Sequence, residues 1–242
     1  MCNGQPITAP TCNFLRVSAQ MRNLDKQKTA SSCKTLSATL TDHTNYKMTT
    51  KYFDKLLAEI SKTGKPNIED NEYISQFFIP INSTRNSILE EQDKIPEYLY
   101  FINSGFMRLF YYDQNGEEQT TFLCSQNGFI ASFSSLINQT KATENVECIT
   151  DCELLKISFV NAKQLVDKSE IFKNFFLLMF EKSISLATLR ANDLASLNAD
   201  QRYQKMIDQQ AHFIQNIPLQ YIASYLGIKP QSLSRIRKQA IK

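Results

Sequence analysis

The chain has 242 residues, which is enough for two small domains or one large one, each able to bury a hydrophobic core. Apolar residues make up 42% and charged residues 21%, a balance typical of globular proteins that excludes a disordered or fibrous chain. Residues 1–50 and 200–242 have net charges of +4 and +5, whereas residues 51–199 have −6. A basic C-terminal segment after an acidic body suggests an anionic partner.

No segment is typical of a membrane or secreted protein. The apolar run at residues 175–180 is far shorter than the roughly 18 residues of a membrane span, and no signal peptide is visible. We therefore expect a cytoplasmic protein with no membrane partner, in which all cysteines are reduced thiols. No Cys-x-x-Cys pair occurs, and His43 and His212 lie far from any cysteine cluster, so no metal site is expected.

The first 47 residues are rich in Ser, Thr and Asn and have no sustained periodicity, so we expect them to be disordered. An alternative is that translation begins at Met48 and that this extension does not belong to the natural product. Residues 51–62 then predict a short amphipathic helix from the spacing of Phe53, Leu56, Leu57 and Ile60, and residues 71–78 predict another.

Residues 79–158 have the pattern of a β-domain. Aromatic-rich runs at 98–102 and 106–112 predict strands separated by a turn at 103–105. Asn115 and Gly116 suit the positive φ angles of a tight hairpin. Further strands are expected at residues 119–124, 144–149 and 153–158. So many short strands predict a sandwich, jelly roll or small barrel.

Residues 162–197 predict helix, with one apolar stripe at alternating spacings of three and four. Such a stripe is expected where two helices pair along their length, and it favours a homodimer. The alternative is a single buried helix in a monomer. Four further apolar residues, Phe172, Phe175, Phe176 and Met179, could pack on the strand domain. The stripe itself consists of Leu177, Phe180, Ile184, Ala187, Ala191 and Leu194.

The C-terminal segment predicts a helix at 199–213, capped by Asn198, followed by a helix-turn-helix at 219–236. Gly227 allows the sharp turn, and Pro230 starts the second helix. The inner faces of these two helices are small or apolar, and consist of Ile222, Ala223, Leu226, Leu233, Ile236 and Ala240.

The outward face of the second helix is polar and basic, and no acidic residue occurs from residue 219 to 242. Gln and Arg side chains can pair with base edges in a major groove, while Ser and Lys can bind phosphates, so double-stranded DNA is the expected partner. The alternative is a structural helical hairpin with a solvated basic face. The predicted DNA-binding residues are Gln231, Ser232, Ser234, Arg235, Lys238 and Lys242.

Residues 100–110, 113–117 and 194–237 carry a resemblance to the Crp/Fnr family of bacterial transcription regulators, in particular its Bacteroidetes-type members. The resemblance implies an α+β fold with a cyclic-nucleotide-binding-type β-roll (a jelly roll) at 48–165, a long dimerisation helix at 166–197 and a helix-turn-helix domain at 198–242. It implies a homodimer on double-stranded DNA, and it admits RNA polymerase and a small-molecule effector as further partners.

The effector site departs from the family pattern. Family members that bind cyclic nucleotides use a Gly-Glu pair and, about ten residues on, an Arg. Ala131 and Ser132 stand at the first position, and Ala142 and Thr143 at the second. Lys141 is adjacent, but it lacks the guanidinium fork that grips phosphate oxygens. We therefore expect a degenerate pocket that binds cyclic AMP weakly or not at all.

Other sensor chemistries of the family also lose their ligands. Its iron–sulfur branch needs closely spaced N-terminal cysteines, whereas Cys2, Cys12 and Cys33 are far apart. Its haem branch needs a histidine in the sensor, and residues 48–211 contain none. We therefore expect no cofactor, and the remaining cysteines, Cys124, Cys148 and Cys152, are expected to be core strand residues.

The recognition helix differs as well. Pro230 and Gln231 replace an Arg-Glu pair of many family members, while Arg235 is kept, so the operator should differ from the best-known half-site. We also expect the family's winged hairpin to be lacking, so that its bonds to phosphate are either missing or made instead by Lys238 and Lys242. An alternative function is therefore a small-molecule sensor or protein-interaction module that has lost DNA binding. An enzyme is not expected, because no histidine is available to activate Ser132, Ser134 or Ser135.

Overall fold

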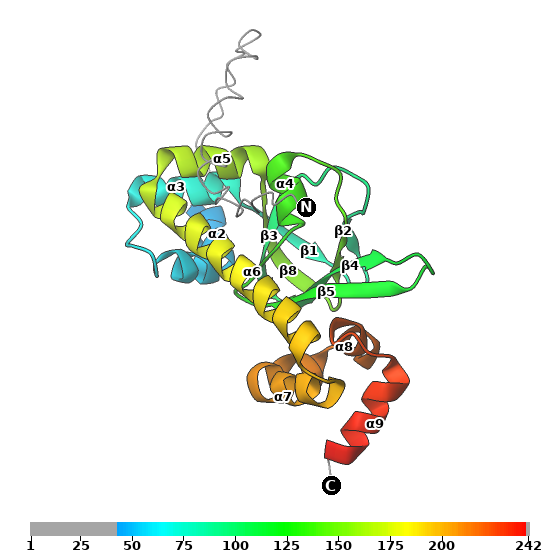
Figure 1. The fold of residues 1–242 in the computed structure, drawn as a ribbon. Helices are drawn as coiled ribbons and strands as arrows, with labels where there is room; N and C mark the ends of the chain where they lie inside the picture. The colour runs from blue at the N-terminus through cyan, green and yellow to red at the C-terminus, as the bar shows by residue number, and fades with distance from the viewer. Residues whose placement is uncertain (1–42, 241–242) are drawn as a thin grey trace, which may run out of the picture. The chain divides into compact units, whose positions relative to one another are not determined.

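The structure is a computed structural model that describes residues 43–240, with the backbone alone for residues 43–51 and 240 (Figure 1). The predicted disordered extension therefore lies outside the described residues as far as residue 42, and Lys242 lies outside them too. Helix α2 begins at His43, within the last five residues of that extension. The helices before the strands are α2 (His43–Ile60) and α3 (Ile68–Phe77), and those after them are α5 (Phe159–Lys168), α6 (Glu170–Ser196), α7 (Ala199–Asn216), α8 (Leu219–Tyr225) and α9 (Pro230–Ala240).

The strands form two four-stranded antiparallel sheets, in the orders β1-β8-β3-β6 and β2-β7-β4-β5. The α+β fold predicted from the sequence is confirmed. A short helix, α4 (Phe133–Asn138), follows β6 and was not expected from the pattern. The strands are β1 (Ile79–Ser83), β2 (Ile88–Glu90), β3 (Tyr98–Ser104), β4 (Phe106–Tyr112), β5 (Glu118–Ser125), β6 (Phe129–Ile130), β7 (Asn145–Cys148) and β8 (Cys152–Ser158).

Two predicted turns have different outcomes. Gly116, with a φ of 75°, lies in the hairpin between β4 and β5, as expected, whereas Asn115 does not have the positive φ predicted for it. The turn predicted at 103–105 is not a hairpin, because β3 and β4 belong to different sheets and the chain crosses between them at Gly105. This glycine has a φ of 100°, and a Cβ there would lie 2.5 Å from the Asp151 carbonyl oxygen, so backbone conformation and space both require glycine.

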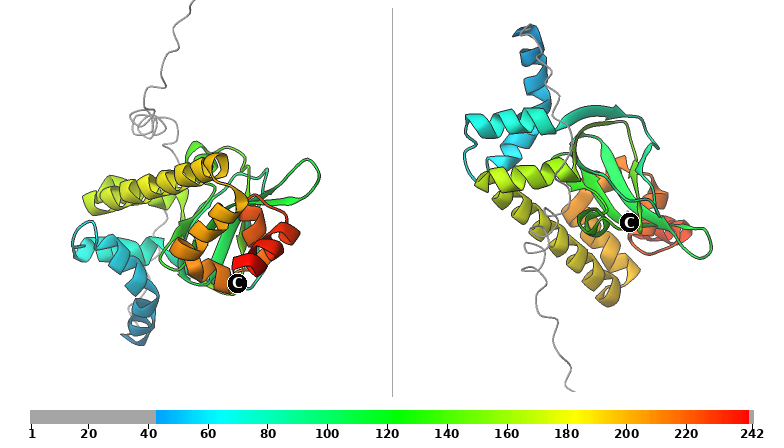
Figure 2. Two further views of the ribbon diagram at one scale, coloured as in Figure 1. Left: turned by 60° about the horizontal axis from the view of Figure 1, so that its bottom comes forward. Right: turned by 90° about the horizontal axis from the view of Figure 1, so that it is seen from above.

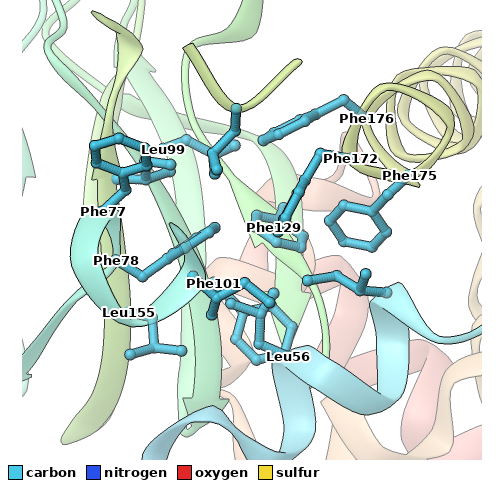
Figure 3. Packing of buried hydrophobic residues seen from close by; sticks show 14 of the residues in the cluster. Leu56, Phe77, Phe78, Leu99, Phe101, Phe129, Leu155, Phe172, Phe175 and Phe176 are labelled. Carbon is cyan, nitrogen blue, oxygen red and sulfur yellow. The ribbon is translucent and has the colours of Figure 1, made fainter. Parts of the chain in front are cut away.

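Phenylalanines from α6 pack on the sheet that contains β3. Figure 3 shows Phe172, Phe175 and Phe176 pointing from the helix toward strand residues, and the ring centroids of Phe129 and Phe175 are 5.6 Å apart. Each fully buried phenylalanine stabilises the fold by about 1.5–3 kcal/mol. The predicted packing of these residues on the strand domain is confirmed.

The helical region predicted at 162–197 consists of two helices. Helix α5 ends at Lys168, and Ser169 caps the next helix by accepting a hydrogen bond from the Phe172 amide. Helix α6 then runs for 27 residues, and its side chains become largely exposed after Phe180. Within the described residues, no helix is both long and apolar enough to cross a membrane.

Candidate nucleic-acid interface

Helices α7, α8 and α9 lie together in Figures 1 and 2, and they share one hydrophobic core with Leu123 of β5, Phe106 of β4 and Ile149. Asn198 caps α7 as predicted, and it forms a reciprocal capping box with Gln201. Five of the six inner-face residues predicted for the helix-turn-helix are buried, and the side chain of the sixth, Ala240, lies outside the description. The five are Ile222, Ala223, Leu226, Leu233 and Ile236. These contacts hold α8 and α9 together, so α9 has one fixed inner face.

The turn between α8 and α9 depends on Gly227. Its φ of 67° lies in the left-handed region, which other residues adopt at a cost. The Ile228 amide donates to the Ala223 carbonyl oxygen at 3.0 Å and so closes the turn. A Cβ on Gly227 would lie 3.0 Å from the Cδ2 atom of Leu194, so the turn also approaches the end of α6 closely.

The opposite face of α9 is polar and basic. Gln231, Ser234, Arg235 and Lys238 are exposed, and Ser232 is half-buried. Neither Arg235 nor Lys238 forms an ion pair with another residue that the structure describes. The predicted residues other than Lys242, which lies outside the description, are therefore presented on one helix whose other face is buried. Such a face has hydrogen-bond donors and acceptors for base edges and cations for phosphates.

The apolar stripe of α6 is uncovered in the single chain. The side chains of Leu177 and Ile184 are 43% and 55% exposed, and Leu194 at the far end is 37% exposed. Phe180 differs, because it is partly buried against Phe133 of α4, with ring centroids 5.4 Å apart. The other two members of the stripe, Ala187 and Ala191, are also exposed.

The predicted effector residues lie around α4. Ala131 and Ser132 are buried directly before this helix, and Ser132 makes no side-chain capping bond. Ala142 is buried as well, and its amide donates to the Lys94 carbonyl oxygen at 2.7 Å. Lys141 and Thr143 are exposed. No carboxylate or guanidinium group therefore stands at the two positions where the resemblance requires them.

A buried arginine that the sequence analysis did not single out links the sheet to the helix-turn-helix. Arg108 of β4 is fully buried and forms ion pairs with Glu147 of β7 and Glu118 of β5. Its guanidinium lies between two rings, 4.0 Å from the centroid of Phe110 and 3.7 Å from that of Tyr221 in α8. Arg108 and Glu147 are opposite each other only because β4 pairs with β7 in this register. The cluster could therefore not be predicted without knowing which strands pair.

Further contacts attach α8 to strand β5. The Ser224 hydroxyl accepts a hydrogen bond from the Thr120 amide at 2.7 Å and donates to the Glu118 carbonyl oxygen at 3.0 Å. Arg190 of α6 donates to the carbonyl oxygens of Thr120 and Tyr225. Burial lowers the pKa of Arg190 and raises the pKa of the Tyr225 hydroxyl. A cavity of about 540 Å³ lies beside this junction, between the β4–β5 hairpin and the turn before α9.

Among the described residues, no group of three or more His, Cys, Asp or Glu side chains is placed to hold a metal ion. Cys124, Cys148 and Cys152 are buried free thiols on strands, as predicted. The Nε2 atom of His212 lies 3.3 Å from the hydroxyl oxygen of Ser125 in β5, which is not one of the serines considered for catalysis. Ser132 and Ser135 are buried.

Part of the chain is similar to a known protein family. Residues 81–169 match the family described as the cyclic nucleotide-binding domain. No curated protein matches the chain.

Solved structures extend the similarity to 67–72% of the chain. FixK2 from Bradyrhizobium japonicum is 14% identical with a TM-score of 0.59, over 67% of this chain and 83% of its own. A protein from Eubacterium rectale, described as a transcriptional regulator of the Crp/Fnr family, is 16% identical with a TM-score of 0.59, over 72% and 83%. The c-di-GMP responsive global regulator CLP of Xanthomonas campestris is 17% identical with a TM-score of 0.56, over 72% and 91%. The protein thus has the fold of Crp/Fnr regulators, and the predicted resemblance is confirmed at that level.

Proposed function

We propose that the protein is a dimeric, sequence-specific DNA-binding transcription regulator of the Crp/Fnr type. The observation that carries this proposal is the geometry of α9, whose inner face is buried while Gln231, Ser234, Arg235 and Lys238 are exposed. A helix of this kind inserts into the major groove with its N-terminal part at the base edges. Arg235 is then the residue best suited to a bidentate contact with guanine.

Dimerisation would use the exposed apolar stripe of α6. Pairing two copies along Leu177, Ile184 and Leu194 would remove these side chains from water. In such a dimer, the two copies of α9 would bind two half-sites that lie one helical turn apart, about 34 Å along the DNA. In this proposal the sensor spans residues 48–165, the dimer helix 166–197 and the DNA-binding domain 198–242.

Cyclic AMP would not be the effector. A bound cyclic phosphate would meet buried alanines at positions 131 and 142, and Lys141 is exposed. A part-buried phosphate without a neutralising partner is costly. The β-roll would therefore act without this ligand, or with one of different chemistry.

The test is a selection from a randomised DNA duplex library with the purified full chain at near-physiological salt. We expect a palindromic consensus that Arg235→Ala abolishes. Arg85→Ala is the matched control, because Arg85 is an exposed arginine of the sensor; this variant should select the same consensus. Equal, sequence-blind binding by all three proteins would contradict the proposal and favour a module that has lost DNA binding.

A further inference from the structure

Two cysteines of the β-roll lie side by side where the chain passes from one sheet to the other. Cys148 ends β7 and Cys152 begins β8, with the three-residue turn 149–151 between them. Both side chains are buried in the same core cluster, and the two thiols are hydrogen-bonded to each other. The third described cysteine, Cys124, lies on β5, and its thiol, like that of Cys152, contacts backbone carbonyl oxygens.

The two thiols differ in access and in acidity. Cys152 lines a surface cavity of about 360 Å³ together with Ser83, Ser104 and Glu153 and is 3% exposed, whereas Cys148 does not line this cavity and is 0% exposed. The hydrogen bond with Cys148, followed by one with the Thr150 side chain, lowers the pKa of Cys152 against the effect of burial. The same bond and burial raise the pKa of Cys148. Cys152 is thus the better nucleophile of the pair.

We propose that Cys148 and Cys152 form a peroxide-sensitive dithiol site, which closes to a disulfide. The Cys152 thiolate attacks one oxygen of hydrogen peroxide, the O–O bond breaks, and the sulfur becomes a sulfenic acid while water leaves. The Cys148 sulfur then attacks the sulfenic sulfur, and a second water leaves as the S–S bond forms. The two thiols lose two electrons and two protons, and one peroxide is reduced to two waters.

The turn between the two cysteines contacts the helical domain. Ile149 is buried in the core that contains Tyr203 and Phe213 of α7. Its amide donates to the Phe106 carbonyl oxygen at 2.8 Å, and the rings of Phe106 and Phe213 are 6.0 Å apart. A disulfide across this turn would shift Ile149 and Phe106 and so change their packing on α7. Oxidation would therefore loosen α7, and, if the proposed function holds, change DNA affinity.

The chemistry is tested by treating the full chain with hydrogen peroxide and mapping its linked peptides by mass spectrometry. All proteins carry Cys2→Ser, Cys12→Ser and Cys33→Ser, so that no N-terminal thiol exchanges with the pair. We expect a Cys148–Cys152 link that forms before Cys124 reacts and that a dithiol reductant reverses. Burial raises the pKa of Cys124 to about 12, which makes Cys124→Ser the matched control that keeps the link.

Two single variants separate the roles of the pair. In Cys148→Ser, the reaction should stop at a sulfenic acid on residue 152, which dimedone traps. In Cys152→Ser, Cys148 should react at least tenfold more slowly than Cys152 does in the parent protein. If either serine variant misfolds, Cys→Ala at the same position replaces it. Absence of the link, or oxidation of Cys124 at the same rate as the pair, would overturn the assignment.

Coupling to α7 is measured without DNA, by hydrogen exchange of the reduced and oxidised protein. Faster exchange in α7 after oxidation, retained in Cys124→Ser and lost in Cys148→Ser, is the expected result. If the disulfide forms and exchange in α7 is unchanged, the proposed coupling is wrong. Because neither measurement uses DNA, failure here is distinguishable from failure of the proposed DNA-binding function.

Discussion

Helix α9 and the region around α4 both depart from the Crp/Fnr pattern, but the replacements differ in kind. In α9 the replacements leave polar groups, including Arg235, exposed on a helix with a well-packed inner face. Around α4 the replacements are small side chains, and Ala131 and Ala142 are buried. A recognition surface can change its residues and still bind, because each contact contributes separately, whereas a phosphate site without its cation loses most of its affinity.

The helix-turn-helix is connected to strands β4 and β5 by charged and polar contacts of α8. Arg108 of the β-roll stacks on Tyr221 of α8, and Ser224 bonds the backbone of β5. In the proposed function, a signal from the β-roll to α9 would pass through this junction. The following predictions test this dependence, in order of decreasing effect.

The largest effect is expected for Glu147→Ala. Glu147 is the buried partner of Arg108, and its removal leaves a buried guanidinium with only the half-exposed Glu118. Breaking a buried pair in this way costs about 3 kcal/mol or more in the free energy of unfolding. Urea unfolding followed by circular dichroism measures this loss.

The control for this prediction is Glu153→Ala, because Glu153 is an exposed glutamate on β8. It should change the free energy of unfolding by less than about 0.5 kcal/mol. If both variants unfold at the same urea concentration as the wild type, the prediction is wrong, and the charge of Arg108 is sufficiently balanced without Glu147.

The second prediction concerns the stripe on α6. Leu177→Glu places a charge in the proposed seam, and we expect the dimer to weaken on the order of 100-fold. Analytical ultracentrifugation measures the dissociation constant.

Leu178→Glu is the matched control for the seam. Leu178 is 48% exposed against 43% for Leu177, but it lies about 100° around the helix. It should leave the dimer intact. If only Leu178→Glu dissociates the dimer, the interface lies on another face of α6. If the wild-type protein is monomeric, the proposed dimer interface is wrong.

Much of the fold could be predicted because its signals are local. The stripe of α6, the Asn198 cap and the Gly227 turn depend on residues close together in the sequence. The crossing at Gly105 could not be predicted, because a glycine after a strand fits a hairpin and a change of sheet equally well. The distinction comes from the contact with Asp151, which is 46 residues away.

The site was predicted to a similar degree. The face of α9 follows from helical periodicity, so its residues could be named in advance. The Arg108 cluster could not, since Glu147 is 39 residues away and only the pairing of β4 with β7 brings it opposite. The contact between Cys148 and Cys152 likewise depends on a turn between two sheets, and the sequence analysis assigned both residues only to the core.

A third prediction separates the phosphate contacts from the base contacts of α9. Lys238→Ala should weaken binding to all sequences by a similar factor, and it should reduce the slope of log K against log salt by about 1. Fluorescence anisotropy across a salt series, with the selected duplex and a scrambled duplex, measures both quantities. A loss confined to the selected duplex would instead assign Lys238 to base recognition.

A smaller effect is expected at the β4–β5 hairpin, next to α8. The Asp113 carboxylate accepts hydrogen bonds from the Glu117 and Asn115 amides, which lower its pKa below the ordinary value of 3.8. Its contribution to stability is therefore present above that value and lost as pH falls through the lowered pKa. Asp113→Asn should lower Tm slightly at pH 7 and match the wild type near pH 2. An equal difference at both pH values would contradict this assignment.

The weakest expected response is that of the sensor to cyclic nucleotides. With alanines at 131 and 142 and no guanidinium for the phosphate, millimolar cyclic AMP or cyclic GMP should leave Tm unchanged, because a ligand stabilises the folded state only in proportion to its occupancy. A saturable rise in Tm would show that the buried alanines and the exposed Lys141 are compatible with a cyclic phosphate. The contrast between α9 and the α4 region would then be wrong, because both regions would bind their ligands with residues that differ from the family pattern.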